Sequence, residues 1–219
     1  ASVALSSRSG RMARDASCLA ERIAASVRVM AADVCDAAEA SSWSLGHAAL
    51  AGVLHAAGVL QDRLLRSMST RELDAVFAPK ALAASHVQHL VARDSLEALG
   101  LFSSVSATFG NVGQANYAAA NAYLDALARS GRRCGRLSSS LQIPAVRGSG
   151  MGAATFDKGQ LDAMGAISLD EFAAFLCASL SPARSASERT QAPLAKALVA
   201  MAGAGVCECG PVGGDTAPS

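Results

Sequence analysis

Short apolar runs alternate along this chain with longer segments of helical periodicity, and this alternation constrains the fold more than any other feature. Such an order places consecutive strands parallel in one sheet and packs the intervening helices on its faces. Five runs, each bounded by Gly, Ser, Asp or Pro, are predicted strands: residues 2–6, 27–31, 52–55, 99–103 and 137–143. The chain is therefore predicted to be an α/β protein with a doubly wound parallel sheet.

Apolar residues at three- and four-residue spacing predict the helices. These cover residues 16–25, 41–48, 70–92, 114–130 and 169–180. Within 70–92, Ser69 or Thr70 can cap the start, and only Pro79 interrupts the interior. Six apolar side chains of this helix are available to face the sheet: Leu73, Val76, Phe77, Leu82, Val87 and Leu90.

The organisation along the chain indicates one domain and a tail. Residues 1–180 carry the strand and helix pattern, and the Gly- and Met-rich stretch 148–165 has the composition of a mobile lid. From residue 181 onward Pro, Ser, Ala and Gly dominate. We therefore expect residues 181–219 to be a linker or a disordered tail.

Composition narrows the function classes. Hydrophobic residues make up 51% of the chain but aromatic residues only 4%, which suits a core of Ala, Leu and Val between helices and a parallel sheet. The formal charge is +1 and the charges are scattered, so no nucleic-acid partner is expected. No apolar run approaches the ~20 residues of a membrane helix, so no membrane partner is expected either. A location in the cytoplasm, or in an organelle, follows.

Six cysteines are dispersed without a Cys-x-x-Cys pair or a histidine at ligand spacing. We interpret them as reduced thiols and expect no metal site. Cys207 and Cys209 could hold a soft metal, but two ligands in a Gly-rich tail favour a solvated segment instead.

The densest chemical signal is a strand that ends in serines, followed by a glycine-bearing loop and a helix with Tyr117 near its start. The carboxyl ends of parallel strands are where open α/β sheets bind ligands. Tyr117 and Asn121 leave the same helical face, because they are four residues apart. A ligand site at this edge is therefore predicted.

Reduction of a carbonyl by hydride needs a proton donor, a second hydrogen bond to the carbonyl oxygen and a nearby cation. Tyrosine, serine and lysine can supply these, and a neighbouring ammonium is expected to lower the pKa of the phenol. Taken alone, Tyr117 could equally be a core ring with a satisfied hydroxyl, and Lys80 a solvated helix charge.

Four separated segments fall in one order: His55-Ala-Ala-Gly-Val-Leu, Ala78-Pro-Lys-Ala-Leu, Phe102-Ser-Ser and Asn116-Tyr-Ala-Ala-Ala-Asn. Together they resemble the ketoreductase domains of modular polyketide synthases, a branch of the short-chain dehydrogenase/reductase superfamily. The resemblance covers residues 1–180 and implies a Rossmann-like fold. It implies NADPH-dependent reduction of the β-keto group of a polyketide or fatty acyl thioester. The partners implied are an acyl carrier protein, which carries the β-ketoacyl group on phosphopantetheine, and other synthase domains of the parent polypeptide.

The resemblance assigns catalytic roles to four residues. Tyr117 would be the proton donor, Ser104 the hydroxyl that holds the substrate carbonyl, and Lys80 the cation, with Asn121 as its polar companion. Ordinary short-chain dehydrogenases carry the lysine four residues after the tyrosine, whereas here that position is Asn121. Ser103 and Ser104 point to opposite sides of a strand, so only one of them can face the crevice.

The resemblance also assigns cofactor contacts. The segment Ser7-Arg8-Ser9 resembles the one that meets the adenosine 2′-phosphate, which favours NADPH over NADH because a guanidinium suits a phosphate. Asp33-Val34 resembles the adenine contact. The remaining implied contacts lie beside the nicotinamide ribose: His55, Ala56, Ala57, Gly58, Lys80 and Tyr117. Each of the first two segments could alone be a turn.

Other positions resemble residues that orient the substrate. Leu60-Gln61-Asp62 is similar to the Leu-Asp-Asp motif of ketoreductases that form the D-configured hydroxyl, and Phe109 stands where the opposite class carries Trp. Pro144 remains from a Trp-Gly-Pro-Trp-like run whose aromatic residues are absent here. Asp62 could also be only a capping or turn residue.

The sequence contains no Gly-x-Gly-x-x-Gly segment, the loop that cradles a dinucleotide pyrophosphate. We expect this loop and the first strand to precede Ala1, and the chain alone to bind cofactor poorly and to be unstable. A catalytically silent ketoreductase remnant within a synthase is therefore one alternative. A free-standing short-chain reductase for a small ketone is another, which Asn121 disfavours.

Overall fold

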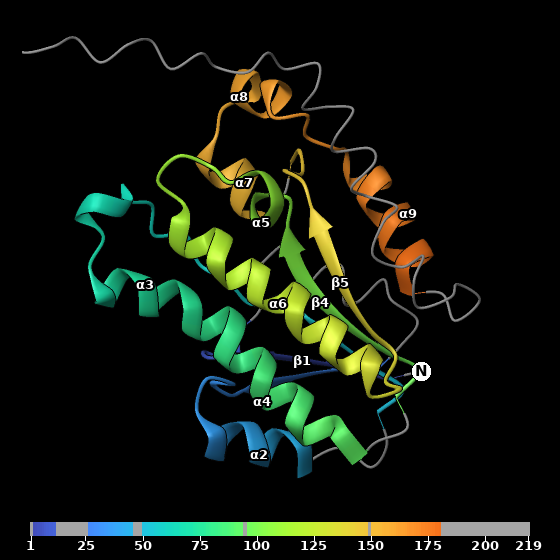
Figure 1. The fold of residues 1–219 in the computed structure, drawn as a ribbon. Coiled ribbons are helices and arrows are strands. Elements are labelled where there is room, and N and C mark those ends of the chain that lie inside the picture. Colours follow the sequence, from blue (N-terminus) through green and yellow to red (C-terminus); the bar gives the residue numbers. More distant parts are fainter. Residues whose placement is uncertain (1, 12–25, 46–49, 94–95, 149, 181–219) are drawn as a thin grey trace, which may run out of the picture.

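The computed structural model describes residues 2–11, 26–45, 50–93, 96–148 and 150–180 (Figure 1). All five predicted strands are present within one residue at either end, and all pair in parallel: β1 (Ser2–Ser7), β2 (Ser26–Ala31), β3 (Gly52–His55), β4 (Ala98–Ser104) and β5 (Ser138–Ile143). The predicted helix at 16–25 and the tail at 181–219 lie outside the described residues.

The strands form two parallel sheets, which is the arrangement of a doubly wound sheet that lacks its first, central strand. One sheet has the order β1-β2 and the other β3-β4-β5. Within the described ranges no strand joins β1 to β3, so those two edges carry unpaired backbone groups. The register aligns the carboxyl ends of β4 and β5, because Ser104 lies beside Ile143.

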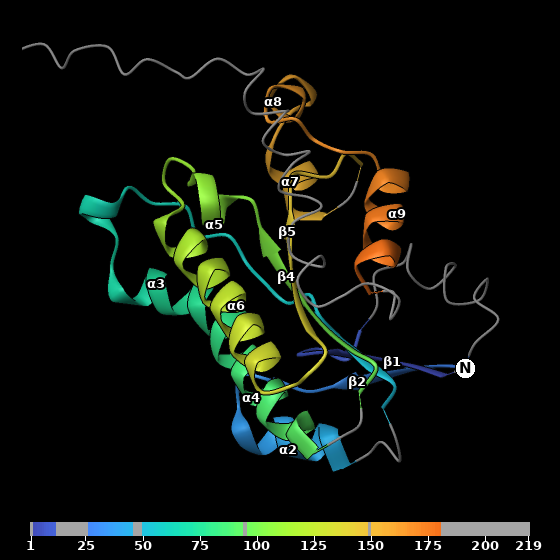
Figure 2. The ribbon, with the colours of Figure 1, turned by 45° about the vertical axis from the view of Figure 1, so that its right-hand side comes forward.

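Helices cover both faces of the β3-β4-β5 sheet (Figures 1 and 2). On one face lie α6 (Ala115–Arg133), α3 (Thr70–Phe77) and α4 (Ala83–Leu90), with α2 (Ala37–Leu45) beside α4; on the other face lies α9 (Leu169–Leu180). The core between α4, α6 and the sheet is aliphatic, as the composition predicts: Ala84, Val87, Val91, Leu99, Leu101, Leu124 and Ala128. This packing of helices on both faces of a parallel sheet confirms the α/β prediction.

The predicted helix at 70–92 is one continuous helical segment with an altered turn inside it. Ser69 and Glu72 form a capping box at the start of α3. Pro79 lies in a π-helical turn, η2 (Ala78–Leu82), which joins α3 to α4, and a 3-10 turn η3 (Val91–Arg93) ends the segment. Proline lacks the N–H that an α-helical turn needs, which explains the local widening.

Two side chains of this segment were assigned wrongly to the sheet face. Val76 and Val87 are buried as predicted, but Leu73 and Leu82 are 38% and 44% exposed. Leu73 belongs to α3, which packs on α6 rather than on a strand, and Leu82 follows the inserted residue of the π turn. A constant period of 3.6 residues cannot predict correctly which face of the helix a residue occupies both before and after such an insertion.

Short helices complete the described structure: η1 (Leu65–Ser67), α5 (Ser106–Phe109), α7 (Gly150–Thr155) and α8 (Lys158–Ala163). The stretch 148–165, expected from composition to be a lid, thus forms α7 and α8, and Asp157 and Gln160 make a capping box at α8. No helix in the described ranges is long and apolar enough to span a bilayer.

Leu124 tests the packing of α6 on the sheet, because its side chain is fully buried. Leu124→Ala is expected to lower the free energy of unfolding by ~2–5 kcal/mol, the range for buried Leu→Ala changes that leave a cavity. Leu65, 73% exposed on η1, is the matched control, and Leu65→Ala should change stability by less than ~0.5 kcal/mol. Urea unfolding followed by circular dichroism measures both, and equal losses would contradict the packing described.

Candidate active site

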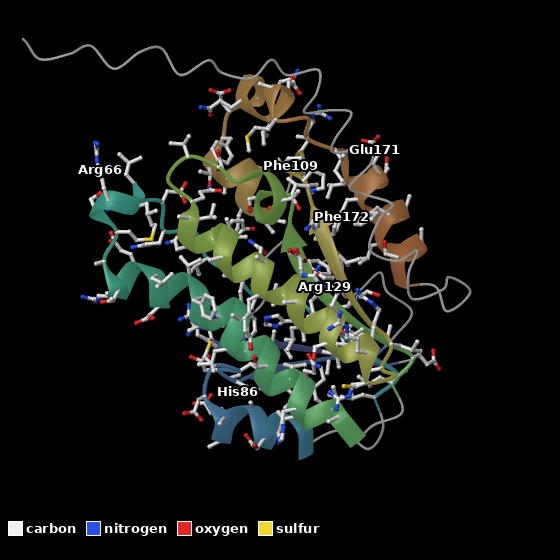
Figure 3. The ribbon with its side chains drawn as sticks, viewed as in Figure 1. Arg66, His86, Phe109, Arg129, Glu171 and Phe172 are labelled. Carbon is white, nitrogen blue, oxygen red and sulfur yellow. The ribbon has the colours of Figure 1, made fainter. Side chains whose placement is uncertain are left out.

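A cavity of about 540 Å³ opens at the carboxyl ends of β4 and β5. Its walls come from the loop after β3, from η2, from α5 and the start of α6, and from the segment that carries α7, α8 and α9. Eight residues predicted for the site line it: Ala56, Gly58, Leu60, Lys80, Ser104, Phe109, Tyr117 and Pro144. Figure 3 shows Phe109 on α5 and Phe172 on α9 near these strand ends.

Lys80 brings the one ammonium group to this cavity lining, from the π turn. Its side chain is 2% exposed, and Nζ donates a hydrogen bond to the Phe102 carbonyl at 2.8 Å. Burial lowers the pKa of Lys80 to about 8, opposed by the negative charge of Asp125. Gly58 makes room for the side chain, because a Cβ there would lie 2.9 Å from Lys80 Cε.

Tyr117 lies in the first turn of α6, with its ring 5.2 Å from Lys80 Nζ, measured to the centroid. Burial raises the pKa of Tyr117, while side-chain hydrogen bonds with Asn121 and Ser104 oppose that rise. The expected lowering by the lysine is therefore wrong for this structure. The physical reason is that Nζ faces the ring and the Phe102 carbonyl, and desolvation of the phenolate has the larger effect.

The two serines at the end of β4 have different surroundings. Ser103 is 3% exposed, and its hydroxyl donates to the Asn121 carbonyl at 3.2 Å, which ties β4 to α6. Ser104 Oγ accepts from the Ser106 N–H at 3.2 Å and is the serine hydroxyl that pairs with Tyr117. Both serines line the cavity, so the expectation that strand alternation lets only one of them face it is wrong. The hydrogen bond to Tyr117 nevertheless supports Ser104, which was chosen on family spacing.

Asn121 is fully buried one turn after Tyr117. Its Nδ2 donates to the Tyr117 carbonyl at 2.8 Å, whereas its Oδ1 has no hydrogen-bond partner among the described residues. The resemblance made it a companion of Lys80, but the hydrogen bonds join it to Tyr117 and to β4 through Ser103. A buried acceptor of this kind has the capacity to take one more donor at the site.

Asn116 was quoted in a motif but given no role, and it fixes the surroundings of Tyr117. Its Nδ2 donates to the carbonyls of Gln61 and Glu72 at 2.9 and 3.2 Å, and its Oδ1 accepts the Tyr117 N–H at 2.8 Å. Gln114 Nε2 donates to Asp62 Oδ2 at 3.0 Å. Gln61 and Asp62 therefore lie outside the cavity lining and hold the Leu60 loop onto α6.

Asp125 is a second residue that the sequence reasoning missed. Its carboxylate accepts hydrogen bonds from Ser140 Oγ and, at 2.8 Å, from Gln142 Nε2 on β5. Its charge also acts on Lys80. The available signal was spacing, because Tyr117, Asn121 and Asp125 follow one another at four-residue intervals and so share a helix face.

The residues predicted to contact the adenosine lie at the ends of β1 and β2, outside the cavity lining. The Ala32 N–H donates to the Ser7 carbonyl at 3.0 Å, which places the Ser7-Arg8-Ser9 turn beside the segment of Asp33 and Val34. A hydrogen bond from the Cys35 N–H lowers the pKa of Asp33, and the charge of Arg8 adds to this. The two predicted segments are therefore brought together.

Two further residues predicted as cofactor contacts, His55 and Ala57, do not line the cavity. His55 is 7% exposed, and its Nε2 lies 3.1 Å from the Lys80 carbonyl oxygen. The ring is thus directed to the π turn. Within the described ranges, no group of three or more His, Cys, Asp or Glu residues could hold a metal ion.

Comparison with known proteins identifies the family. The model of the KR domain matches residues 1–148. Among curated relatives, the spectinabilin polyketide synthase system protein NorB of Streptomyces orinoci is 44% identical over 142 residues, which cover 64% of this chain and 6% of that protein. Polyketide synthase GfsB of Streptomyces halstedii is 41% identical over 175 residues, or 76% of this chain and 3% of the relative.

Solved structures show the same architecture. A-type ketoreductases from a modular polyketide synthase superimpose with a TM-score of 0.74 at 34% identity, over 81% of this chain and 39% of theirs. The ketoreductase PlmKR1 from the first module of phoslactomycin biosynthesis in Streptomyces sp. HK803 gives 0.75 at 32% identity, over 83% of this chain and 44% of its own. The chain thus spans less than half of these structures, and 6% or less of those two relatives. The family model, the relatives and the solved structures agree with the four motifs, and the chain belongs to the KR domain family, the ketoreductases of polyketide synthases.

Proposed function

We propose that this chain forms the catalytic part of an NADPH-dependent ketoreductase. Its substrate is a β-ketoacyl group on the phosphopantetheine of an acyl carrier protein, and its product is the β-hydroxyacyl thioester. The observation that carries the proposal is the convergence of Ser104, Tyr117 and Lys80, from three separate elements, on one cavity. A hydroxyl, a phenol and an ammonium are the groups that carbonyl reduction requires.

The substrate carbonyl oxygen fits between the hydroxyls of Ser104 and Tyr117. Ser104 Oγ accepts the Ser106 N–H, which leaves its own hydrogen free to be donated to the substrate. When bound, NADPH supplies hydride to the carbonyl carbon. As negative charge develops on the carbonyl oxygen, Ser104 and Tyr117 donate hydrogen bonds to it, and Tyr117 then transfers its proton. The Lys80 ammonium lies over the ring and would attract the negative charge that forms there, although desolvation of the phenolate has the larger effect on the pKa of Tyr117.

The described residues fit a nicotinamide cofactor at two places. Near the cavity, Gly58 and Ala56 give a narrow backbone strip beside Lys80, and Lys80 uses one of its three N–H donors on the Phe102 carbonyl. At the ends of β1 and β2, the Arg8 guanidinium lies among small hydroxyl residues, which suits a 2′-phosphate. Ser7, Ser9, Asp33 and Val34 would complete that contact.

The apolar walls of the cavity suit an acyl chain and orient it. Leu60, Phe109 and Pro144 line the cavity, and Gln61 and Asp62 act on Leu60 through the hydrogen bonds to α6. We propose that this loop directs formation of the D-configured hydroxyl. Residues 1–180 form the catalytic domain in this proposal, and other domains of a synthase polypeptide surround it.

Tyr117→Phe tests the proton donor, because it removes the hydroxyl and keeps the ring. The rate of NADPH oxidation with a β-ketoacyl thioester is expected to fall by ~10²–10⁴-fold, the usual contribution of a positioned acid. Tyr123→Phe is the control, since its hydroxyl pairs with Ser85 on the outer face of α6 and should leave the rate unchanged. A Tyr117→Phe variant at the wild-type rate would refute the mechanism. A wild type that binds NADPH but does not oxidise it would favour the silent-remnant alternative.

The pH dependence tests Lys80. Its pKa is lowered to about 8, so the ammonium is present below that pH and lost above it. The phenol stays protonated over this range, because burial raises the pKa of Tyr117. Therefore kcat/KM should fall as pH rises through about 8.

Asp125→Asn should move this fall in kcat/KM to lower pH. The reason is that the Asp125 charge opposes the effect of burial on Lys80. Asp74→Asn, on the exposed face of α3, is the matched control and should leave the profile unchanged. Profiles of kcat/KM against pH for the three proteins decide the matter, and identical profiles would contradict the role of Asp125.

A further inference from the structure

The direction of the Lys80 side chain depends on the π turn in which it lies. The Ala83 N–H donates to the Ala78 carbonyl five residues earlier and also to the Lys80 carbonyl. A π turn holds one more residue than an α-helical turn and so changes the direction in which its side chains leave the helix. Because of this turn, Lys80 Nζ reaches the Phe102 carbonyl at the end of β4.

His55, the last residue of β3, contacts this turn from the sheet. Its Nε2 lies 3.1 Å from the Lys80 carbonyl oxygen. A carbonyl oxygen can only accept, so the ring must be the donor. Burial lowers the pKa of His55, opposed by the backbone carbonyls of Lys80 and Pro79, and the neutral ring supplies the single N–H that this bond needs.

Gly58 leaves the space that the side chain of the same lysine occupies. A Cβ at Gly58 would lie 2.9 Å from Lys80 Cε and 3.5 Å from Nζ. Lys80 is therefore bound at its carbonyl by His55 and at its ammonium by the Phe102 carbonyl, and the absence of a side chain at Gly58 makes room for its stem. The segment His55-Ala-Ala-Gly58 thus supplies both a hydrogen bond and the space that this lysine needs.

We propose that His55 is a positioning residue for Lys80: its imidazole N–H binds the Lys80 carbonyl and holds the widened helical turn in the conformation that directs the ammonium into the cavity. The proposal deepens the proposed function, on which its kinetic consequence rests. It gives His55 a different role from the cofactor contact that the motif resemblance implies. Without this donor, the Lys80 carbonyl would keep only the Ala83 N–H, and the turn would be free to adopt another conformation in which Lys80 leaves the helix in a different direction.

Three substitutions of His55 separate the hydrogen bond from the bulk of the ring. His55→Gln carries an amide N–H at about the position of Nε2, His55→Asn is too short to reach, and His55→Leu has no donor. Val87→Ala is the matched control, because Val87 is a buried core residue of α4. It should lower stability without affecting Lys80.

The first readout does not require activity. The chain has three lysines, Lys80, Lys158 and Lys196, so lysine labelled with ¹³C at Cε gives three resonances to titrate by NMR. In the wild type, His55→Gln and Val87→Ala, the Lys80 resonance should titrate near 8. In His55→Leu and His55→Asn it should move toward the ordinary value of 10.5, as the ammonium leaves its buried place.

The second readout is kinetic. His55→Leu and His55→Asn should lower kcat by at least ~10-fold while KM for NADPH changes by less than ~2-fold, and His55→Gln should restore kcat to within ~3-fold of the wild type. If His55→Leu or His55→Asn keeps the wild-type Lys80 titration, the proposal is wrong. It is also wrong if His55→Gln is folded but behaves like His55→Leu. If the Lys80 titrations are as expected and NADPH binds, but none of the proteins turns over, the positioning role is upheld and the proposed reductase function is refuted.

Discussion

The site depends on a buried ammonium group. A lysine at 2% exposure has lost nearly all of its hydration, which is costly unless the protein supplies compensating polar groups. The Phe102 carbonyl accepts one of its hydrogens, the charge of Asp125 acts on it from α6, and the face of the Tyr117 ring lies next to it. These partners come from β4 and from α6, whereas Lys80 itself lies on the π turn. The ammonium can therefore be held in the cavity only when the helices and the sheet are assembled.

The local backbone is adapted to this lysine. Pro79 prevents a regular α-helical turn, and the π turn that results sets the direction of Lys80. Gly58 leaves the space that the lysine stem occupies, since any larger residue would meet it. Proline and glycine cost stability within regular elements, but here each answers a geometric requirement of one charged side chain. The position of Lys80 is thus set in part by neighbours that take no part in the reaction.

The sequence predicted the strands and helices well because their periodicity depends on burial alone. Strand alternation could not separate Ser104 from Ser103, because both line the cavity, and the choice of Ser104 rested on the spacing of the family motif. The sequence did not predict the π turn, and so misplaced Leu82, because an insertion of one residue leaves no periodic trace. The sequence also did not predict the hydrogen-bond partners of His55 and Asn121. His55 and Lys80 are 25 positions apart in the sequence, and Asn121 and Ser103 are 18 apart, so only the assembled fold brings these partners together.

Buried hydrogen bonds also connect Tyr117 to the loop that carries Leu60. Asn116 binds two carbonyls and the Tyr117 N–H at once, so the segments of Gln61 and Glu72 cannot move without disturbing the start of α6. Ser103 connects the middle of the same helix to β4. A buried hydrogen bond contributes little to stability once one partner has moved away from the other. The Tyr117 phenol, the serine and the substrate loop are therefore expected to become ordered in the same folding step. The chemistry requires that outcome, because a proton donor is effective only where the carbonyl oxygen is already held.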